Sequence, residues 1–524
     1  MTTRRHALGL AAGGLLVSSP GWAQSSAAPS PPSSESAFAP STDVLAGLDD
    51  WLEAQRVAWR VPGMAVALVR GGQAVYVNAF GTRDAAHVLP VNTDTLFRGA
   101  STTKAFCAAL VAMLVDDGKL AWDAPLTTYL PELRFAGGDE YRSVNLRDLL
   151  SHRTGLPRHE LVWYHNQTLT AQGLLERLPF LELSAALRIK YQYNNLMYAL
   201  AGLVIERVTG QPWQSFAQTR LFRPLGMGRV TLSAPEMAQD ANHAVGHTTR
   251  GRKWLPIPLR HDPLLGLAGA VNASIADYAK WLQLQLGLGQ WGGRQLISTA
   301  SMAAMWEPLI LTSDTPRAPD FQRGHYGLGW RIDRYRDSLR VAHGGDLNGH
   351  TPRVVLLPEK QVGLVVMVNH GNHPFANAVT PDLLDRLLGL PPGDNSARAL
   401  ARRNKAEAAP RGRDADADAS ATNFIPGTRP SRPLPAYAGS YRHAGYGDMQ
   451  VSDSVQGLAV RYNDMPALLR HGHFDVFEVR TDRPEHGEFN GTRLVFQGDE
   501  AGRLSGFTAV LDSSVRPVLF NRVA

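Results

Sequence analysis

Cysteine is nearly absent from this chain of 524 residues, which contains only Cys107. A single thiol excludes an intramolecular disulfide. Cys107 lies on the apolar side of a helix that is predicted to end near Gly118, where a left-handed helix stop is expected. We therefore interpret Cys107 as a small core residue and not as a thiol nucleophile.

Blocks of basic charge and long apolar segments are also lacking. The formal net charge of +6 is spread along the chain. We therefore interpret this charge as a property that favours solubility, and not as a sign of nucleic-acid binding. Beyond the N-terminus, no segment of the sequence is apolar enough to cross a membrane. The length allows two or three domains, and the charged fraction of 19% is that of an ordinary globular protein.

The N-terminus has the three parts of a signal peptide. Arg4 and Arg5 are followed by an apolar run at 7–17 and by small residues that end at Ala23. The run is too short for a stable membrane anchor, so we predict cleavage of residues 1–23 and a periplasmic or secreted protein. The paired arginines are compatible with the twin-arginine route and with ordinary export. Residues 24–40 are rich in Ser, Pro and Ala and are predicted to be a disordered spacer.

Residues 41–390 are predicted to form one α+β domain. A helix at 46–59 and a hairpin at 64–80 come first, a mainly helical stretch follows, and the chain then returns to strands. The later strands are expected at 326–332, 338–343, 351–357 and 362–369, before a closing helix at 381–388. Strands from the two ends can therefore share one sheet, with the helical region inserted between them.

The remaining residues change in character. Residues 391–432 mix positive and negative charges with alanine, which is typical of a solvated linker. Residues 433–524 contain short segments with period-two alternation, which favours a small antiparallel barrel or sandwich. These segments are 448–451, 458–462, 474–479, 494–496, 504–510 and 517–521.

The most informative stretch begins the helix that contains Cys107. Ser101 and Lys104 are three residues apart, so they share one helical face. A serine hydroxyl becomes a nucleophile when a neighbour takes its proton, and a lysine that burial keeps neutral can do so. Alone, the pair also fits a capping serine followed by a solvated lysine.

Two further pieces follow in the chain. Tyr193 and Asn195 stand directly before an apolar helix, and His343 precedes the glycines Gly344 and Gly345. Taken singly, the first pair fits a loop and the second piece fits a turn. Their joint occurrence with the serine–lysine pair is what makes them informative.

In this order the three pieces resemble the serine β-lactamase and penicillin-binding-protein superfamily. The closer likeness is to the class C β-lactamase-like serine hydrolases, which include esterases and D-amino-acid-specific peptidases. The segments at 149–157 and 326–330 add to it. The resemblance implies an antiparallel sheet flanked by helices, with an inserted helical region. Residues 437–447 resemble the lipocalin-like domain that is appended to some of these hydrolases.

The resemblance also implies a mechanism. Ser101 attacks a carbonyl carbon and becomes acylated, while Lys104 takes its proton directly or with Tyr193. Tyr193 returns a proton to the leaving group and later helps to activate water. We expect two nearby cations to lower the pKa of this phenol.

Four further residues complete the expected site. Asn195 binds the substrate amide or holds Lys104. The backbone N–H groups of Ser101 and Asp346 form an oxyanion hole. Gly344 and Gly345 let the edge of a strand approach the substrate backbone.

His343 departs from the family pattern, in which a lysine favours a substrate carboxylate. Histidine is mostly neutral near pH 7, so the permanent charge is lost. This favours a peptidase or amidase, with D- or unusual residues among the substrates, over a β-lactamase. A short-chain carboxylesterase, and a penicillin- or peptidoglycan-binding sensor with little turnover, remain alternatives. The partner is a small molecule or peptide.

No cofactor is expected. His471 and His473 look like half of a zinc-ligand set, but no suitable histidines follow them. The walls of the substrate pocket are expected to come from loops such as 158–170 and 262–273.

Overall fold

The computed structural model describes residues 44–312, 321, 323–391, 393–408 and 424–523. The predicted signal peptide at 1–23 and the spacer at 24–40 lie outside the described residues. Among the helices that are described, none is long and apolar enough to cross a membrane.

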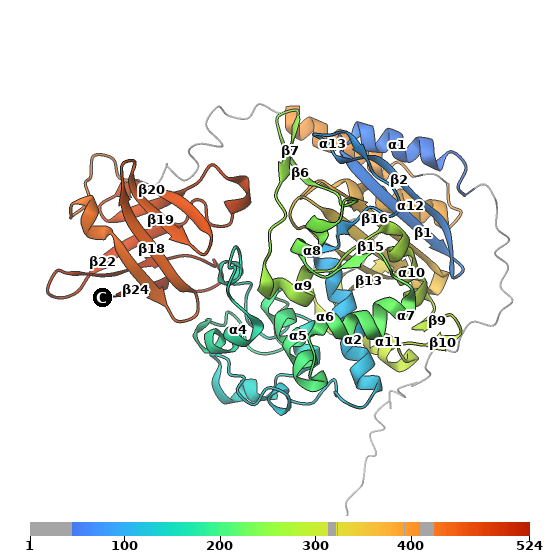
Figure 1. The fold of residues 1–524 in the computed structure, drawn as a ribbon, viewed down its shortest axis with the longest axis horizontal. Coiled ribbons are helices and arrows are strands. Elements are labelled where there is room, and N and C mark those ends of the chain that lie inside the picture. The colour runs from blue at the N-terminus through green and yellow to red at the C-terminus, as the bar shows by residue number, and fades with distance from the viewer. Residues whose placement is uncertain (1–43, 313–320, 322, 392, 409–423, 524) are drawn as a thin grey trace, which may run out of the picture. The chain divides into compact units, whose positions relative to one another are not determined.

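One antiparallel sheet joins strands from both ends of the first domain (Figure 1). Its central pairing places β16 against β1, with Val366 opposite Val66. In spatial order its strands are β11 Ile310–Leu311, β12 His325–Tyr326, β13 Arg331–Tyr335, β14 Ser338–Gly344, β15 Thr351–Leu357, β16 Val362–Val368, β1 Gly63–Arg70, β2 Gln73–Asp84 and β3 Leu89–Pro90. The predicted α+β order, with one shared sheet, is confirmed.

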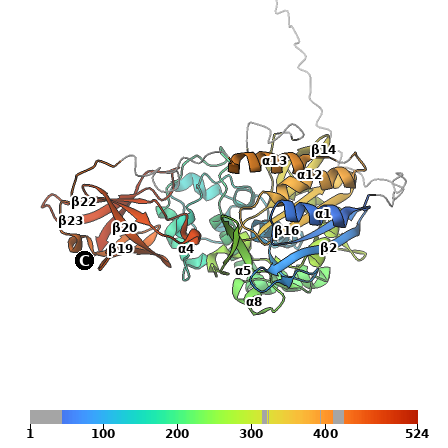
Figure 2. The ribbon, with the colours of Figure 1, turned by 90° about the horizontal axis from the view of Figure 1, so that it is seen from above.

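Helices cover both faces of this sheet because its strands are apolar on both sides. Met64 and Val66 of β1 point into a core that includes residues of α1 Leu48–Ala58 and α12 Phe375–Leu387. Ala65 of the same strand faces the core shared with α2 and α10. Figure 2 shows α1 and α12 together along one side of the sheet. Helix α2, which contains Lys104 and follows Ser101 directly in the chain, is therefore anchored on the opposite side.

The inserted region between β3 and β11 is largely helical, as predicted. The helices outside the α1/α12 layer are α2 Thr103–Asp116, α3 Leu146–Leu150, α4 Ala171–Arg177, α5 Leu196–Thr209, α6 Trp213–Ala217, α7 Arg223–Leu225, α8 Ala234–Gln239, α9 Gly266–Gly269, α10 Ile275–Leu286 and α11 Thr299–Met305. Gly118 has a φ of 69°, which confirms the left-handed position expected after α2.

Short strands also lie in the inserted region, where none was predicted. They are β4 Phe97–Arg98, β5 Val230–Thr231, β6 Gly246–Arg250, β7 Lys253–Ile257, β8 Asn272–Ala273, β9 Gln290–Trp291 and β10 Arg294–Gln295. The β4–β8 pairing bonds the segment just before Ser101 to residues far along the chain.

Two predicted boundaries differ from the structure. The closing helix begins at Phe375, and Pro381 lies inside it; the buried Phe375 and Val379 pack against the sheet and extend the helix toward its N-terminus. Part of the predicted linker is also helical, as α13 Asn395–Ala408. The Asp382 carboxylate accepts hydrogen bonds from the backbone of Asn395 (2.9 Å) and Ser396 (2.9 Å), so a tertiary contact holds the start of this helix.

The last domain is a closed antiparallel barrel, which confirms the predicted all-β class. Its strands are β17 Gly439–His443, β18 Gly447–Ser454, β19 Gly457–Tyr462, β20 Met465–His473, β21 Val476–Arg480, β22 Arg493–Gly498, β23 Leu504–Ala509 and β24 Val518–Val523. Aromatic rings fill its interior: Phe507 stacks on Phe520 with centroids 5.1 Å apart, and Tyr441 packs on Phe507 at 4.9 Å. The barrel interior is therefore a packed core. The predicted resemblance to a lipocalin-like domain stays a prediction.

Candidate active site

Ser101 and Lys104 stand at the start of α2, where the chain leaves the β4–β8 pairing. Ser101 belongs to a 3₁₀ turn, Ala100–Thr102, that continues directly into the helix. Ala100 has a φ of 46°, an uncommon backbone conformation for a residue with a side chain. Lys104 Nζ lies 3.2 Å from Ser101 Oγ. The one-turn spacing predicted from the sequence therefore brings the two groups into contact.

The hydrogen bonds of Lys104 leave its lone pair for the serine. Lys104 Nζ donates to Asn195 Oδ1 at 2.8 Å and to the Ala268 carbonyl at 2.9 Å. A neutral amine has two hydrogens, and these two acceptors use both. The lone pair then faces Ser101, whose hydroxyl can donate to it. This is the geometry that a general base for Ser101 requires.

Burial supplies the neutral amine that this arrangement needs. Lys104 is fully buried. Desolvation holds the pKa of its amine well below the usual range, and the cationic Arg158 adds to this effect. The negative charge of Glu160 opposes it.

Tyr193 also lies at this centre. Its side chain lines the same cavity as Ser101, and Lys104 Nζ is 4.7 Å from the centroid of its ring. The expectation that cations lower the pKa of this phenol is wrong. Desolvation of the partly buried ring raises it, and outweighs the opposing effects of Ser101 and of the nearby arginines, including Arg158. Tyr193 therefore carries its proton at neutral pH and is suited to donate it.

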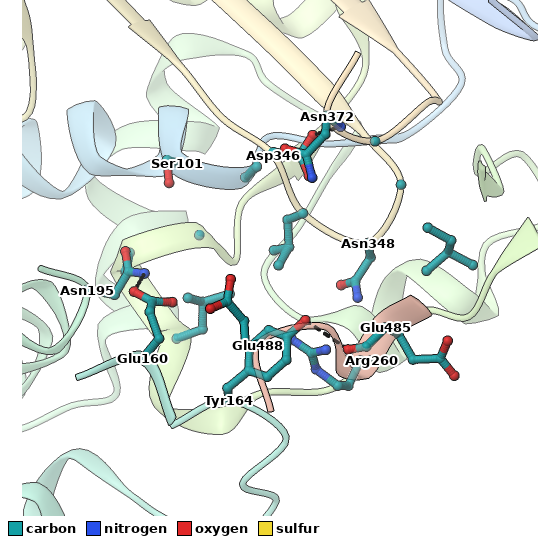
Figure 3. Close-up of a pocket in the computed structure, with 18 of the residues that line it drawn as sticks. Ser101, Glu160, Tyr164, Asn195, Arg260, Asp346, Asn348, Asn372, Glu485 and Glu488 are labelled. Carbon is teal, nitrogen blue, oxygen red and sulfur yellow. Dashed lines mark hydrogen bonds between the residues drawn. The ribbon is translucent and has the colours of Figure 1, made fainter. Parts of the chain in front are cut away.

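Asn195 connects Lys104 to a carboxylate that the sequence analysis missed. Asn195 Nδ2 donates to Glu160 Oε1 at 3.2 Å (Figure 3). Glu160 also pairs with Arg158 at 2.9 Å. The side chain that accepts from Lys104 is thus fixed by a charged partner. The one signal in the sequence was that Glu160 lies in the loop 158–170, which was predicted to form part of the pocket wall.

The end of β14 lies directly against Ser101. A Cβ atom added to Gly345 would lie 2.5 Å from the Ser101 backbone nitrogen and 2.7 Å from Ala100 Cβ. Only glycine fits at this distance. The neighbouring Gly344 and Asp346 line the same hollow as Ser101. The contact seen is with the backbone of Ser101, so the predicted approach of this strand edge to a substrate backbone stays a prediction.

His343 is engaged by the protein on both ring nitrogens. Its Nδ1 lies 2.6 Å from the Gly344 carbonyl, which can only accept, so Nδ1 carries the proton. Nε2 therefore accepts from the Tyr326 hydroxyl at 2.8 Å. Burial holds the pKa of His343 well below its usual range, so the ring is neutral. In this state it has no free donor for a carboxylate, and its contact with substrate stays a prediction.

A cavity of about 400 Å³ opens in front of Ser101 and falls in the size range of small-molecule sites. Tyr193, Asn195 and Asp346 line it, and both predicted wall loops contribute. The adjoining hollow contains Ser101 with His343, Gly344 and Gly345. The eight residues predicted for the site therefore meet around one serine, with Lys104 buried beneath it.

The described residues contain no group of three or more metal-ligating side chains placed to hold an ion. His471, which was considered as a zinc ligand, lies in β20 of the barrel, where its Nε2 donates to the Phe474 carbonyl at 2.9 Å.

Replacing Glu160 with glutamine should change the pH dependence of the site more than its maximal rate. The amide keeps an oxygen that can accept from Asn195, so kcat/KM on the pH plateau should fall by less than about fivefold. Loss of the negative charge should lower the pKa of Lys104 further and move the acid limb of the kcat/KM profile to lower pH. A limb that stays in place, or moves to higher pH, would contradict this electrostatic link.

Comparison with known proteins gives consistent matches. Residues 48–388 match the family model described as Beta-lactamase, and residues 425–520 match one described as a domain of unknown function (DUF3471). The chain is 30% identical over 435 residues to the unguisins hydrolase ungD of Aspergillus violaceofuscus, covering 76% of this chain and 75% of that protein. It is 28% identical over 348 residues to penicillin-binding protein 4 of Amycolatopsis lactamdurans, covering 64% and 87%. The octameric penicillin-binding protein homologue from Pyrococcus abyssi shares the fold, with a TM-score of 0.59 at 19% identity over 91% of this chain and 100% of that one.

Proposed function

The chain belongs to the beta-lactamase family, and from this membership and the geometry at Ser101 we propose that it is a serine hydrolase that cleaves amide or peptide bonds through an acyl-enzyme. One observation carries the proposal. A buried, neutral Lys104 has both N–H bonds committed to protein acceptors and its lone pair directed at Ser101.

The proposed reaction has two halves. Ser101 Oγ attacks the carbonyl carbon while its proton passes to Lys104, and the backbone N–H groups of Ser101 and Asp346 stabilise the oxyanion. Tyr193 gives its proton to the leaving amine, and the resulting phenolate recovers a proton from Lys104. A water then attacks the acyl-enzyme while its proton passes to Lys104, directly or through the Tyr193 hydroxyl, which gives its own proton to Lys104 as it accepts that of the water. Lys104 returns this proton to Ser101 Oγ as the acid leaves, which restores Ser101 and the neutral amine.

The preference for amides over β-lactams rests on His343. A neutral ring supplies no permanent positive charge for the carboxylate of a penicillin-type substrate. The curated relatives include a protein named as a hydrolase and one named as a penicillin-binding protein. A β-lactamase, a short-chain carboxylesterase and a sensor that acylates without turnover are therefore the alternatives to test.

We also propose that the enzyme acts in the periplasm or after secretion, on a small molecule or peptide. The support is the signal-peptide pattern at residues 1–23, which the sequence alone provides.

A substrate panel tests the proposal. It contains a chromogenic β-lactam, D- and L-amino-acid amides, a short linear peptide and a nitrophenyl ester. We expect many turnovers per enzyme on at least one amide or peptide, with no loss of activity in chelator. Turnover of the ester alone would favour the esterase. One equivalent of acylation followed by a stall, on every substrate, would identify a sensor.

A further inference from the structure

The C-terminal barrel contributes part of the wall of the cavity in front of Ser101. Pro484, Glu485 and Glu488, from the segment between β21 and β22, line that cavity together with the catalytic residues. The Tyr164 hydroxyl of the hydrolase domain donates to the Glu485 carbonyl at 2.9 Å (Figure 3). The barrel segment is thus bonded to the wall loop of the active site.

Polar contacts also hold the barrel against the wall loop next to this segment. Tyr462 of the barrel donates to the Leu161 carbonyl at 2.8 Å, and Asn463 Nδ2 donates to the Tyr164 carbonyl at 2.9 Å. Phe489, next to Glu488, is fully buried and donates its N–H to the His486 carbonyl at 3.0 Å. Glu488 is therefore carried on an anchored turn.

The charges in the cavity do not balance. The two arginines that line it are both paired, Arg158 with Glu160 at 2.9 Å and Arg260 with Asp262 at 2.8 Å. Figure 3 shows the Glu488 carboxylate directed into the cavity beside Glu160. Within the described part of the chain, Glu488 forms no ion pair. Burial raises the pKa of Glu160, and the negative charge of Glu488 adds to this effect. A cavity that contains the nucleophile thus has an uncompensated carboxylate opposite it.

We propose that Glu488 is a specificity-determining residue that binds the protonated amino group of the substrate. The substrates selected would be unblocked peptides and amino-acid amides, whose ammonium group lies close to the scissile carbonyl. This inference rests on the proposed function, because it assigns a substrate class to the same cavity. It also gives the barrel a role, since the catalytic domain would supply the chemistry and the barrel the recognition of the amine.

Two acyl-site probes test the inference independently of the natural substrate. They are fluorophosphonates that differ in one group: the first carries a primary ammonium, and the second carries the same nitrogen acetylated and neutral. The measured quantity is the ratio of their second-order rates of Ser101 labelling in the full-length protein. We expect the ammonium probe to react about fivefold faster, near the upper range for a partly exposed ion pair. The ratio should shrink at high salt.

Matched variants identify the carboxylate responsible. Glu488→Gln should bring the ratio close to one, and Glu488→Lys should invert it. Glu485→Gln is the control, because Glu485 is in the same segment but its carboxylate points away from Ser101 in Figure 3. It should keep the wild-type ratio.

The outcomes separate this inference from the proposed function. Equal labelling by both probes in the wild type, or a ratio unchanged by Glu488→Gln, would overturn the role of Glu488 and leave the nucleophile assignment intact. Failure of both probes to label Ser101 would overturn the proposed function and this inference with it.

Discussion

Replacing Ser101 with alanine should abolish catalysis. We expect kcat to fall by at least about 10³-fold, because loss of the nucleophile of an acyl-enzyme mechanism leaves only binding and oxyanion stabilisation. Covalent labelling by a fluorophosphonate should disappear completely, since no other hydroxyl has a neutral amine directed at it in the described active site. Kinetics with the best substrate of the panel, and intact-protein mass spectrometry after labelling, measure the two effects.

The control for this variant is the folded state. Ser101 is only partly buried, and its hydroxyl contacts Lys104 and Tyr193 without supporting the core. The melting temperature of Ser101→Ala should stay close to that of the wild type. A folded variant that retains turnover would show that another residue is the nucleophile.

The serine–lysine pair could be predicted from the sequence because its geometry is local. Residues three positions apart on a helix lie on the same face, and this does not depend on the rest of the fold. His343 and its glycines could be found only because their order along the chain resembles a family. Glu160 and Glu488 could not be found, since each is an ordinary loop carboxylate whose neighbours lie far away in sequence.

The pKa of Tyr193 was predicted with the wrong sign for a physical reason. Arg158 Cζ lies 5.2 Å from the ring centroid and does act to lower the pKa, whereas Lys104, with Nζ at 4.7 Å, is buried and its own pKa is lowered. The opposing effect is desolvation, and its size depends on how completely the folded chain excludes water. Composition and spacing contain no measure of that exclusion.

The elements that were missed in the fold have similar causes. Strand β20 contains Pro466 and Gly472, which interrupt the alternation expected of a strand. Helix α13 is mostly exposed; it packs on the core through Ala399 and Leu400 and begins with hydrogen bonds to Asp382 of the preceding helix. In both cases a tertiary partner stabilises a segment whose local pattern favours a loop.

The second large effect concerns Lys104 and pH. The amine acts as a base only when unprotonated, so kcat/KM should rise with pH through the pKa of Lys104 in the folded protein and then reach a plateau. Because burial lowers that pKa well below 10.5, the plateau should be reached well below pH 10. An ordinary lysine would give a rate that still increases up to about pH 10. A profile of kcat/KM from pH 4 to 10 distinguishes the two.

Substitutions should show that the acid limb belongs to Lys104. Lys104→Arg keeps a long basic side chain but cannot lose its proton, so kcat/KM should fall by at least about 10³-fold at every pH. Asp346 also titrates in this range, since burial raises its pKa to about 6. Asp346→Asn keeps the backbone N–H expected in the oxyanion hole and should leave the limb in place. Disappearance of the limb in Asp346→Asn, or activity in a folded Lys104→Arg variant, would remove Lys104 from the role of base and transfer the proton chemistry to another group.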